Sequence, residues 1–180
     1  PGFVMAVKAS RFLTHIKRLK EPEEPVARLL GRLEGLGERL GPVLLQLPPN
    51  LKADLGKLDA CLRLFPDTIR VAVEPRHESW WTDSTRSLLE RHRAALVWAD
   101  RGSRVITPLW QTTDWGYVRL HAGRAQPWPN YGPGALRSWA ERIQAYGSQD
   151  VYVYFNNDPG GAAVHNARTF KDLVAVTAGG

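Results

Sequence analysis

Short apolar runs alternate along the chain with longer segments in which apolar residues recur every three or four positions. The short runs are rich in β-branched and aromatic residues and nearly continuous, as in parallel strands that are covered on both faces. They predict strands over residues 3–8, 43–47, 69–74, 95–100, 116–121 and 151–156.

The segments between these runs have helical periodicity. The apolar positions from Val26 to Leu40 form one leucine-rich stripe, which predicts a helix that is closed by Gly41-Pro42. The segment 123–134 is rich in proline and glycine and predicts a long loop, a kind of segment that is often functional in compact domains. Further helices are predicted over residues 53–65, 84–93, 135–146 and 166–174.

This alternation predicts an α/β protein with a parallel sheet. Six strands in 180 residues match the length per unit of a TIM-type (β/α) barrel, whose eight units take about 250 residues. We therefore predict a single domain over residues 1–180 that is an incomplete barrel, with about six of eight βα units and without its N-terminal units. An open doubly wound sheet is the competing architecture, but Lys8-Ala9-Ser10-Arg11 replaces its glycine-rich first turn.

The composition is that of an ordinary globular protein, with 43% hydrophobic and 23% charged residues. No apolar run approaches the roughly 20 residues that span a bilayer, and no secretory leader is recognisable. The only cysteine, Cys61, falls on the apolar side of a predicted helix, which favours core packing over catalysis. These features predict a cytoplasmic protein without a membrane segment.

The net charge of +6 suggests a nucleic-acid partner. However, arginines scattered over helix faces give the same balance without any such partner. We therefore rank nucleic acid below a small molecule as the ligand, and keep the basic stretch 15–20 as its candidate contact.

Every predicted strand ends in polar residues. The carboxyl ends of barrel strands meet at one mouth, where the active sites of such barrels lie. Alternation along a strand places Tyr117, Arg119 and His121 on one face, and charged groups there must be paired or face a solvated pocket. The predicted catalytic residues are Glu74, Asp100, His121 and His15. The predicted substrate-binding residues are Lys8, Gln46, Arg76, Arg119, Tyr117, Asn156 and Asn157.

Purely structural interpretations of the same residues stay open. Glu74 and Arg119 could neutralise each other as an internal ion pair. The stretch 156–161 also has ordinary turn composition. The repetition of polar groups at all the strand ends is the observation that favours a site.

Several stretches together resemble the DUF72 family, the YecE-like proteins of unknown function. The resemblance covers residues 1 to about 175, and its motifs are 6–8 with Arg11 and 14–15, then 40–49, 73–77 with Trp80, 117–121 and 152–157. It implies a TIM-type barrel whose pocket is built from the strand-end residues. It also implies a preceding part with a Gly-Ser-Gly-Trp-like stretch and a strand containing Glu-Asn, neither of which is present here. The family's activity is not established, so the resemblance leaves the function open.

Our first functional hypothesis is an enzyme that acts on a small anionic or phosphorylated substrate at the barrel mouth, with hydrolase- or isomerase-like chemistry. Arg76, Arg119 and Lys8 would hold the anion, because arginine suits bidentate contact with phosphate or carboxylate. Glu74 or Asp100 would be the general base.

Histidine would carry the proton in this hypothesis, from His121 or His15, and Gln46 and Asn156 would orient substrate hydroxyls. No cofactor is firmly implied. The alternatives are a metal-assisted phosphodiester hydrolase, in which the predicted catalytic residues hold a divalent metal, and a nucleic-acid-binding module. No spaced metal motif supports the former, and the nearby lysine and arginine oppose a cation.

Overall fold

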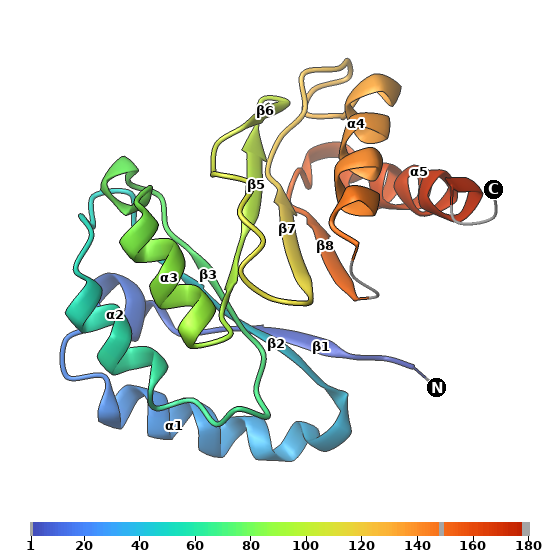
Figure 1. The fold of residues 1–180 in the computed structure, drawn as a ribbon. Helices are drawn as coiled ribbons and strands as arrows, with labels where there is room; N and C mark the ends of the chain where they lie inside the picture. The colour runs from blue at the N-terminus through green and yellow to red at the C-terminus, as the bar shows by residue number, and fades with distance from the viewer. Residues whose placement is uncertain (1, 148–149, 178–180) are drawn as a thin grey trace. The chain divides into compact units, whose positions relative to one another are not determined.

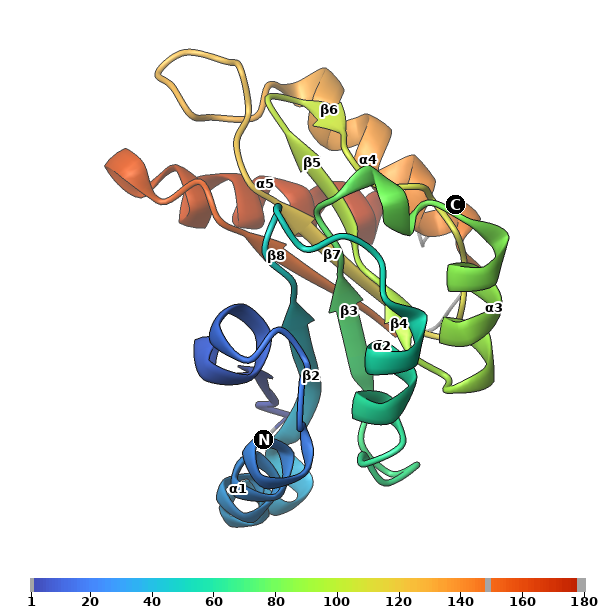
Figure 2. The ribbon, with the colours of Figure 1, turned by 90° about the vertical axis from the view of Figure 1, so that its left-hand side faces the viewer.

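The structure, a computed structural model, describes residues 2–147 and 150–177. The chain divides into two compact units, Pro1–Val97 and Trp98–Gly180. Each unit contains one four-stranded sheet with helices packed around it (Figures 1 and 2).

The first unit is built on an all-parallel sheet in the order β1-β2-β3-β4. Figure 1 shows its helices following one another along one side of the strands. The strands are β1 (Met5–Lys8), β2 (Leu40–Gln46), β3 (Val71–Glu74) and β4 (Ala95–Leu96). The helices are η1 (Phe12–Ile16), α1 (Glu23–Leu33), η2 (Glu34–Arg39), α2 (Leu55–Leu62), η3 (Glu78–Trp80) and α3 (Asp83–Arg91).

Local chemistry sets the helix starts in this unit. The side chain of Asp54 accepts a hydrogen bond from the backbone N–H of Lys57 and caps α2. Thr82 caps α3 in the same way through the N–H of Thr85. Each cap satisfies a backbone donor that the first helical turn leaves without a partner, which fixes where the helix begins.

The core of the first unit lies between the central strands and the helices. From Gly41 onward the residues of β2 are buried, and β3 is buried throughout, as expected of strands covered on both faces. Cys61 is fully buried on α2, and burial raises the pKa of its thiol to about 12. Cys61 therefore belongs to the core, as the sequence predicts.

The second unit has the sheet order β6-β5-β7-β8, in which only the β5–β6 pair is antiparallel. Its α4 and α5 pack on the sheet over an aromatic core that includes Trp98, Tyr131 and Trp139. The strands are β5 (Trp98–Arg101), β6 (Arg104–Val105), β7 (Gly116–Leu120) and β8 (Val151–Phe155). The helices are α4 (Pro133–Ala145), η4 (Pro159–Gly161) and α5 (Ala162–Thr177).

The predicted α/β class with parallel strands is confirmed, and all six predicted strands are present. The strand predicted over 95–100 is divided at Val97 between β4 and β5, and the short hairpin strand β6 was not predicted. The strands form two sheets, so the incomplete TIM-type barrel and the single domain over 1–180 stay predictions.

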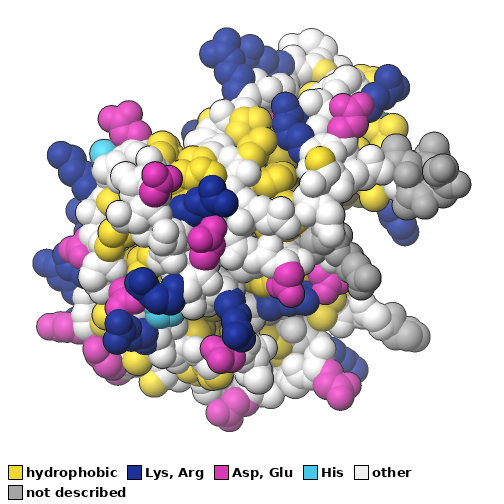
Figure 3. Space-filling view, viewed as in Figure 1, with side chains coloured by type: hydrophobic (Ala, Val, Ile, Leu, Met, Phe, Trp, Pro, Cys, Tyr) yellow, Lys and Arg dark blue, Asp and Glu magenta, His cyan; other side chains and the backbone are white. Residues whose placement is uncertain are grey.

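Charge on the first unit is mixed. Figure 3 shows Lys and Arg side chains interspersed with Asp and Glu over α1, α2 and α3. Ion pairs one helical turn apart join Arg28 to Glu24 and Arg86 to Glu90. This distribution agrees with arginines scattered over helix faces, and a nucleic-acid partner stays a prediction. Among the residues described, no helix has the length and apolar character needed to cross a membrane.

Candidate functional site

The carboxyl ends of β1, β2 and β3 carry a continuous chain of hydrogen-bonded polar side chains. The register pairs Gln46 with Glu74 on adjacent strands, so their side chains leave the sheet side by side. Lys8 Nζ donates to Gln46 Oε1 at 3.0 Å, and Gln46 Nε2 donates to Glu74 Oε2 at 3.0 Å. Arg76 completes the chain from the other side, because its Nε and Nη2 donate to Glu74 Oε1 at 3.1 and 3.0 Å.

Glu74 is the buried centre of this cluster, with 0% of its surface exposed. A carboxylate is costly to bury unless it is paired and hydrogen-bonded, and here Arg76 supplies the charge and Gln46 a further donor. Both carboxylate oxygens are engaged, so Glu74 fixes the orientation of its two neighbours. Glu74 therefore holds Gln46 and Arg76 in place before any ligand binds.

His15 lies just after β1, on the short helix η1. Its Nδ1 is 2.8 Å from Thr14 Oγ1, and that hydroxyl donates to the backbone oxygen of Ser10 at 3.2 Å. Since the hydroxyl hydrogen is used, Thr14 Oγ1 accepts from Nδ1–H of His15. This assignment leaves Nε2 of the neutral ring as a proton acceptor.

The electrostatic surroundings of His15 are positive. The pKa of His15 is lowered from its usual 6.5, first by burial and then by the charges of Arg11, Lys8 and Arg76. Three cations therefore act on one imidazole, and the ring is neutral at pH 7. Arg11 and Thr14 were not among the predicted site residues, although they follow the end of β1 by only three and six residues.

In the second unit, Arg119 and Asn156 meet at the ends of β7 and β8. Arg119 Nε donates to Asn156 Oδ1 at 3.1 Å. Tyr117, at the start of β7, stacks on Tyr154 of β8 with ring centroids 4.9 Å apart and planes inclined by 23°. Tyr117 is buried, so it contributes to the wall of the sheet.

Two predicted site residues hold the loop that joins β7 to α4. Asp100 is fully buried and accepts hydrogen bonds from Tyr131 Oη and, at 3.0 Å, from Trp139 Nε1. Burial raises the pKa of Asp100 in spite of these bonds. Asn157 Nδ2 donates to the backbone oxygen of Pro129 at 3.1 Å, which ties the same loop to the end of β8.

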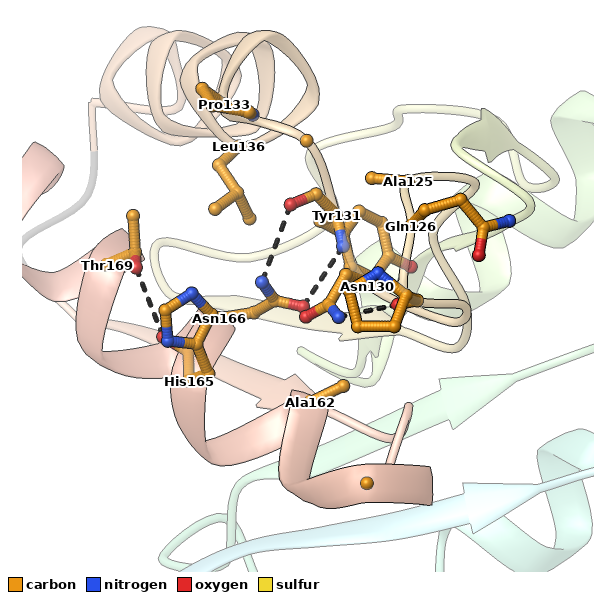
Figure 4. A pocket seen from close by; sticks show the side chains of 13 residues that line it. Ala125, Gln126, Asn130, Tyr131, Pro133, Leu136, Ala162, His165, Asn166 and Thr169 are labelled. Atoms are coloured by element: carbon orange, nitrogen blue, oxygen red, sulfur yellow. Dashed lines mark hydrogen bonds between the residues drawn. The ribbon is translucent and has the colours of Figure 1, made fainter.

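Asn166 on α5 is the second anchor of this loop, and Figure 4 shows its side chain between the helix and the loop. Its Oδ1 accepts from the backbone N–H of Tyr131 at 3.0 Å and from Asn157 Nδ2 at 2.8 Å. Its Nδ2 donates to the backbone oxygen of Tyr131 at 3.4 Å. A pocket of about 580 Å³ lies around this contact.

A second pocket, of about 540 Å³, opens at the carboxyl ends of the strands of this unit. It contains two of the predicted site residues, His121 and Asn156. It also contains three residues that the sequence analysis did not single out as ligands, Arg101, Arg124 and Trp128. The signal for two of them was the predicted loop over 123–134, which contains both Arg124 and Trp128.

Metal ligands do not gather in the described ranges. Residues 2–147 and 150–177 contain no group of three or more His, Cys, Asp or Glu side chains that could hold a metal ion. The side chains that the structure brings together are cationic and amide groups around single carboxylates, a set that suits an anion better than a cation.

The fold and these groups define an α/β protein with parallel strands whose polar residues are concentrated at the strand ends. The family model described as "Protein of unknown function DUF72" matches residues 1–179. The chain belongs to the DUF72 family.

Solved structures of this family share the fold. A DUF72 family protein from Thermotoga maritima MSB8 is 28% identical, with a TM-score of 0.86 over 96% of this chain and 74% of that one. A DUF72 family protein from Enterococcus faecalis V583 is 20% identical, with a TM-score of 0.78 over 96% of this chain and 74% of that one. No curated protein matches the chain.

Proposed function

We propose that the protein is an enzyme that binds a small anionic or phosphorylated substrate at the carboxyl ends of β1, β2 and β3. The observation that carries this proposal is the hydrogen-bonded cluster at these strand ends, which holds two cations, Lys8 and Arg76, around a single buried carboxylate. Arg11, Lys8 and Arg76 all lower the pKa of His15. A phosphate or carboxylate among these cations would gain charge-assisted hydrogen bonds, which are about twice as strong as neutral ones.

The cluster is preorganised for this role. Gln46 and Arg76 are held by the buried carboxylate of Glu74, so neither has to be ordered when the substrate arrives. Fixed donors that need no reorganisation are the most effective electrostatic element of catalysis. Lys8 and Arg11 are exposed and supply the solvent-facing part of the anion contact.

His15 is the proposed proton acceptor. The hydrogen bond to Thr14 keeps the proton on Nδ1, and the lowered pKa keeps Nε2 free to accept a proton at pH 7. Gln46 is the group that would orient a substrate hydroxyl. Glu74 acts through Arg76 and Gln46, so we assign it a positioning role in place of the predicted general-base role.

Arg119, Asn156 and His121 lie in the second unit, and their roles in substrate binding and proton transfer stay predictions. Asp100 and Asn157 are assigned supporting roles, because both side chains are buried and bonded to the loop before α4. Tyr117 is assigned a structural role, because its buried ring packs against Tyr154 in the sheet that also carries Arg119.

The test is binding of inorganic phosphate and sugar phosphates to the chain and to Arg11→Gln, measured by calorimetry and by the NMR titration of His15. We expect phosphate to raise the pKa of His15 and Arg11→Gln to weaken binding about tenfold, the size of one charged contact. Arg32→Gln on α1 is the matched control, since it removes an exposed arginine elsewhere. Equal phosphate binding by Arg11→Gln and the unmodified chain would contradict the proposal.

A further inference from the structure

The second unit contains a pocket with the composition of a different ligand site. Its lining combines Arg101, Arg124 and His121 with Asn156 and the indole of Trp128, and none of the described lining residues is acidic. Its volume of about 540 Å³ falls in the range of small-molecule sites, roughly 300–1,000 Å³. The lining therefore offers positive charge and one large planar surface to the same ligand.

Trp128 is exposed over 63% of its surface, although it lies on a firmly held loop. The backbone N–H of Gly123 donates to the oxygen of Pro129 at 2.9 Å, and that of Ala125 donates to the oxygen of Asn130 at 2.9 Å. The loop thus folds back on itself, and Figure 2 shows that this segment, which joins β7 to α4 along the chain, projects outward from the unit. The indole is presented to solvent at the tip of a closed hairpin.

The closure of this loop depends on a close backbone approach. A Cβ atom on Gly123 would lie 1.9 Å from the backbone oxygen of Asn130, so glycine is required there. The base of the loop is fixed in addition by Tyr131, through Asp100 and Asn166. An indole held in this way can stack on a ring without paying the ordering entropy of a flexible loop.

The cations of the pocket come from two directions. Arg101 ends β5, and Arg124 leaves the loop and lies over the turn that follows β5, where a Cβ on Gly102 would be 3.3 Å from its Nε. Asn156, which also lines the pocket, accepts a hydrogen bond from Nε of Arg119. Guanidinium groups bind phosphate or carboxylate through paired donors and also stack on flat rings.

We propose that this pocket binds a small molecule in which a planar aromatic ring carries a phosphate or carboxylate group. The ring stacks on Trp128, and the anion is held by Arg101 and Arg124 with His121 beside them. The site goes beyond the proposed function, because it is made entirely of residues of the second unit and requires nothing of Lys8, Arg11 or His15.

The first experiment compares phenyl phosphate, cyclohexyl phosphate and inorganic phosphate as ligands of the full chain. The two organic probes share the anion and similar size, and only the former has a planar ring. Binding is followed by NMR at the indole N–H of Trp128, identified as the signal that Trp128→Phe removes. We expect phenyl phosphate to bind at that signal about tenfold more tightly than cyclohexyl phosphate, the size of one stacking contact.

Variants separate the ring contact from the anion contact, and their binding is measured by calorimetry. Trp128→Ala should remove the preference for phenyl over cyclohexyl phosphate, and Trp128→Phe should retain part of it. Arg124→Gln should weaken both organic phosphates alike, by about tenfold. Arg137→Gln, which changes an exposed arginine on α4, is the matched control and should leave both affinities unchanged.

Failure of this site is distinguishable from failure of the proposed function. Arg11→Gln should leave the Trp128 response to phenyl phosphate intact even if it abolishes phosphate binding in the first unit. Equal affinities for the two organic phosphates, or a preference that survives Trp128→Ala, would overturn the aromatic site. An oligonucleotide that displaces phenyl phosphate with a steep salt dependence would also overturn it, in favour of a nucleic-acid contact.

Discussion

The guanidinium of Arg76 donates two hydrogen bonds to a single carboxylate oxygen of Glu74, the last residue of β3. The other oxygen of Glu74 accepts from Gln46. Arg76 is 25% exposed while Glu74 is 1% exposed at the side chain, so the pair joins a solvent-facing cation to a fully buried anion. Because Glu74 is fixed at the end of β3, these hydrogen bonds hold the guanidinium of Arg76 in a defined position on the charged surface of the candidate site.

Removing Arg76 should destabilise the protein because the Glu74 carboxylate would stay buried without its charge partner. Breaking a buried pair costs about 3–5 kcal/mol, and the partial exposure of Arg76 reduces this to about 2–3 kcal/mol for Arg76→Gln. Urea denaturation measures the change in the free energy of unfolding. Arg86→Gln, which breaks the exposed pair with Glu90, is the control and should cost about 0.5 kcal/mol or less.

Glu74→Gln combined with Arg76→Gln gives a second check on the same contact. The double variant should recover part of the stability, since it no longer buries an unpaired charge. If the double variant loses as much stability as the two single variants together, the two side chains are not coupled.

His15 should titrate below pH 6.5, because burial and the neighbouring cations disfavour its charged form. The unfolded chain then binds this proton first as the pH falls, so stability should decline as the pH drops below about 6.5. Arg11→Gln should raise the pKa of His15 toward its usual value. NMR titration of the imidazole measures both effects, with His15→Gln identifying the signal. A midpoint at or above 6.5 in the unmodified chain would contradict the described surroundings.

Asp100 should show the opposite linkage. Its pKa is raised from 3.8 by burial, so the folded state takes up this proton before the unfolded chain as the pH falls. Asp100→Asn does not titrate at this position. The stability of the unmodified chain relative to Asp100→Asn should therefore increase between neutral pH and pH 4, as measured by denaturation at a series of pH values. A constant difference would show that the carboxyl is not perturbed.

Gly123→Ala should open the loop that presents Trp128. The added methyl would clash with the backbone oxygen of Asn130, and neither partner is a flexible side-chain end. We expect a loss of about 1–3 kcal/mol and faster amide exchange over 123–131. Gly134→Ala, where the added Cβ meets no atom within 4 Å, is the control and should be neutral or slightly stabilising. Unchanged exchange in Gly123→Ala would mean that the loop tolerates a different path.

Strands and helices with strong periodicity were predictable from the residue types. A strand buried on both faces is a continuous apolar run, and a helix buried along one stripe has apolar residues every three or four positions. The helix α5 begins at Ala162, whereas the prediction began at residue 166, because Gly160-Gly161 resembles a helix break. The hairpin between β5 and β6 turns on Gly102 and Ser103, both with positive φ. That two-residue signal is present in the sequence, but the flanking strands are too short to show alternation.

The candidate site was predictable only where its polar residues lie at the end of a strand or directly after it in the sequence. Gln46, Glu74 and Arg76 form one network because adjacent parallel strands end at the same edge. The roles of Asp100 and Asn157 could not be read in advance, because burial by Tyr131, Trp139 and Asn166 depends on contacts between distant segments. Trp128 was recognised only as part of a loop, since the sequence does not say which way a loop side chain faces.

The buried thiol of Cys61 makes chemical labelling a measure of how often the first unit opens. With a pKa of about 12 and no exposed surface, this thiol is closed to an alkylating reagent for as long as α2 stays packed. Since the second unit contains no cysteine, each labelled molecule records one opening of the first unit and none of the second. The labelled fraction after a timed exposure to reagent, read by mass, would thus measure how often the first unit opens, whatever the second unit does.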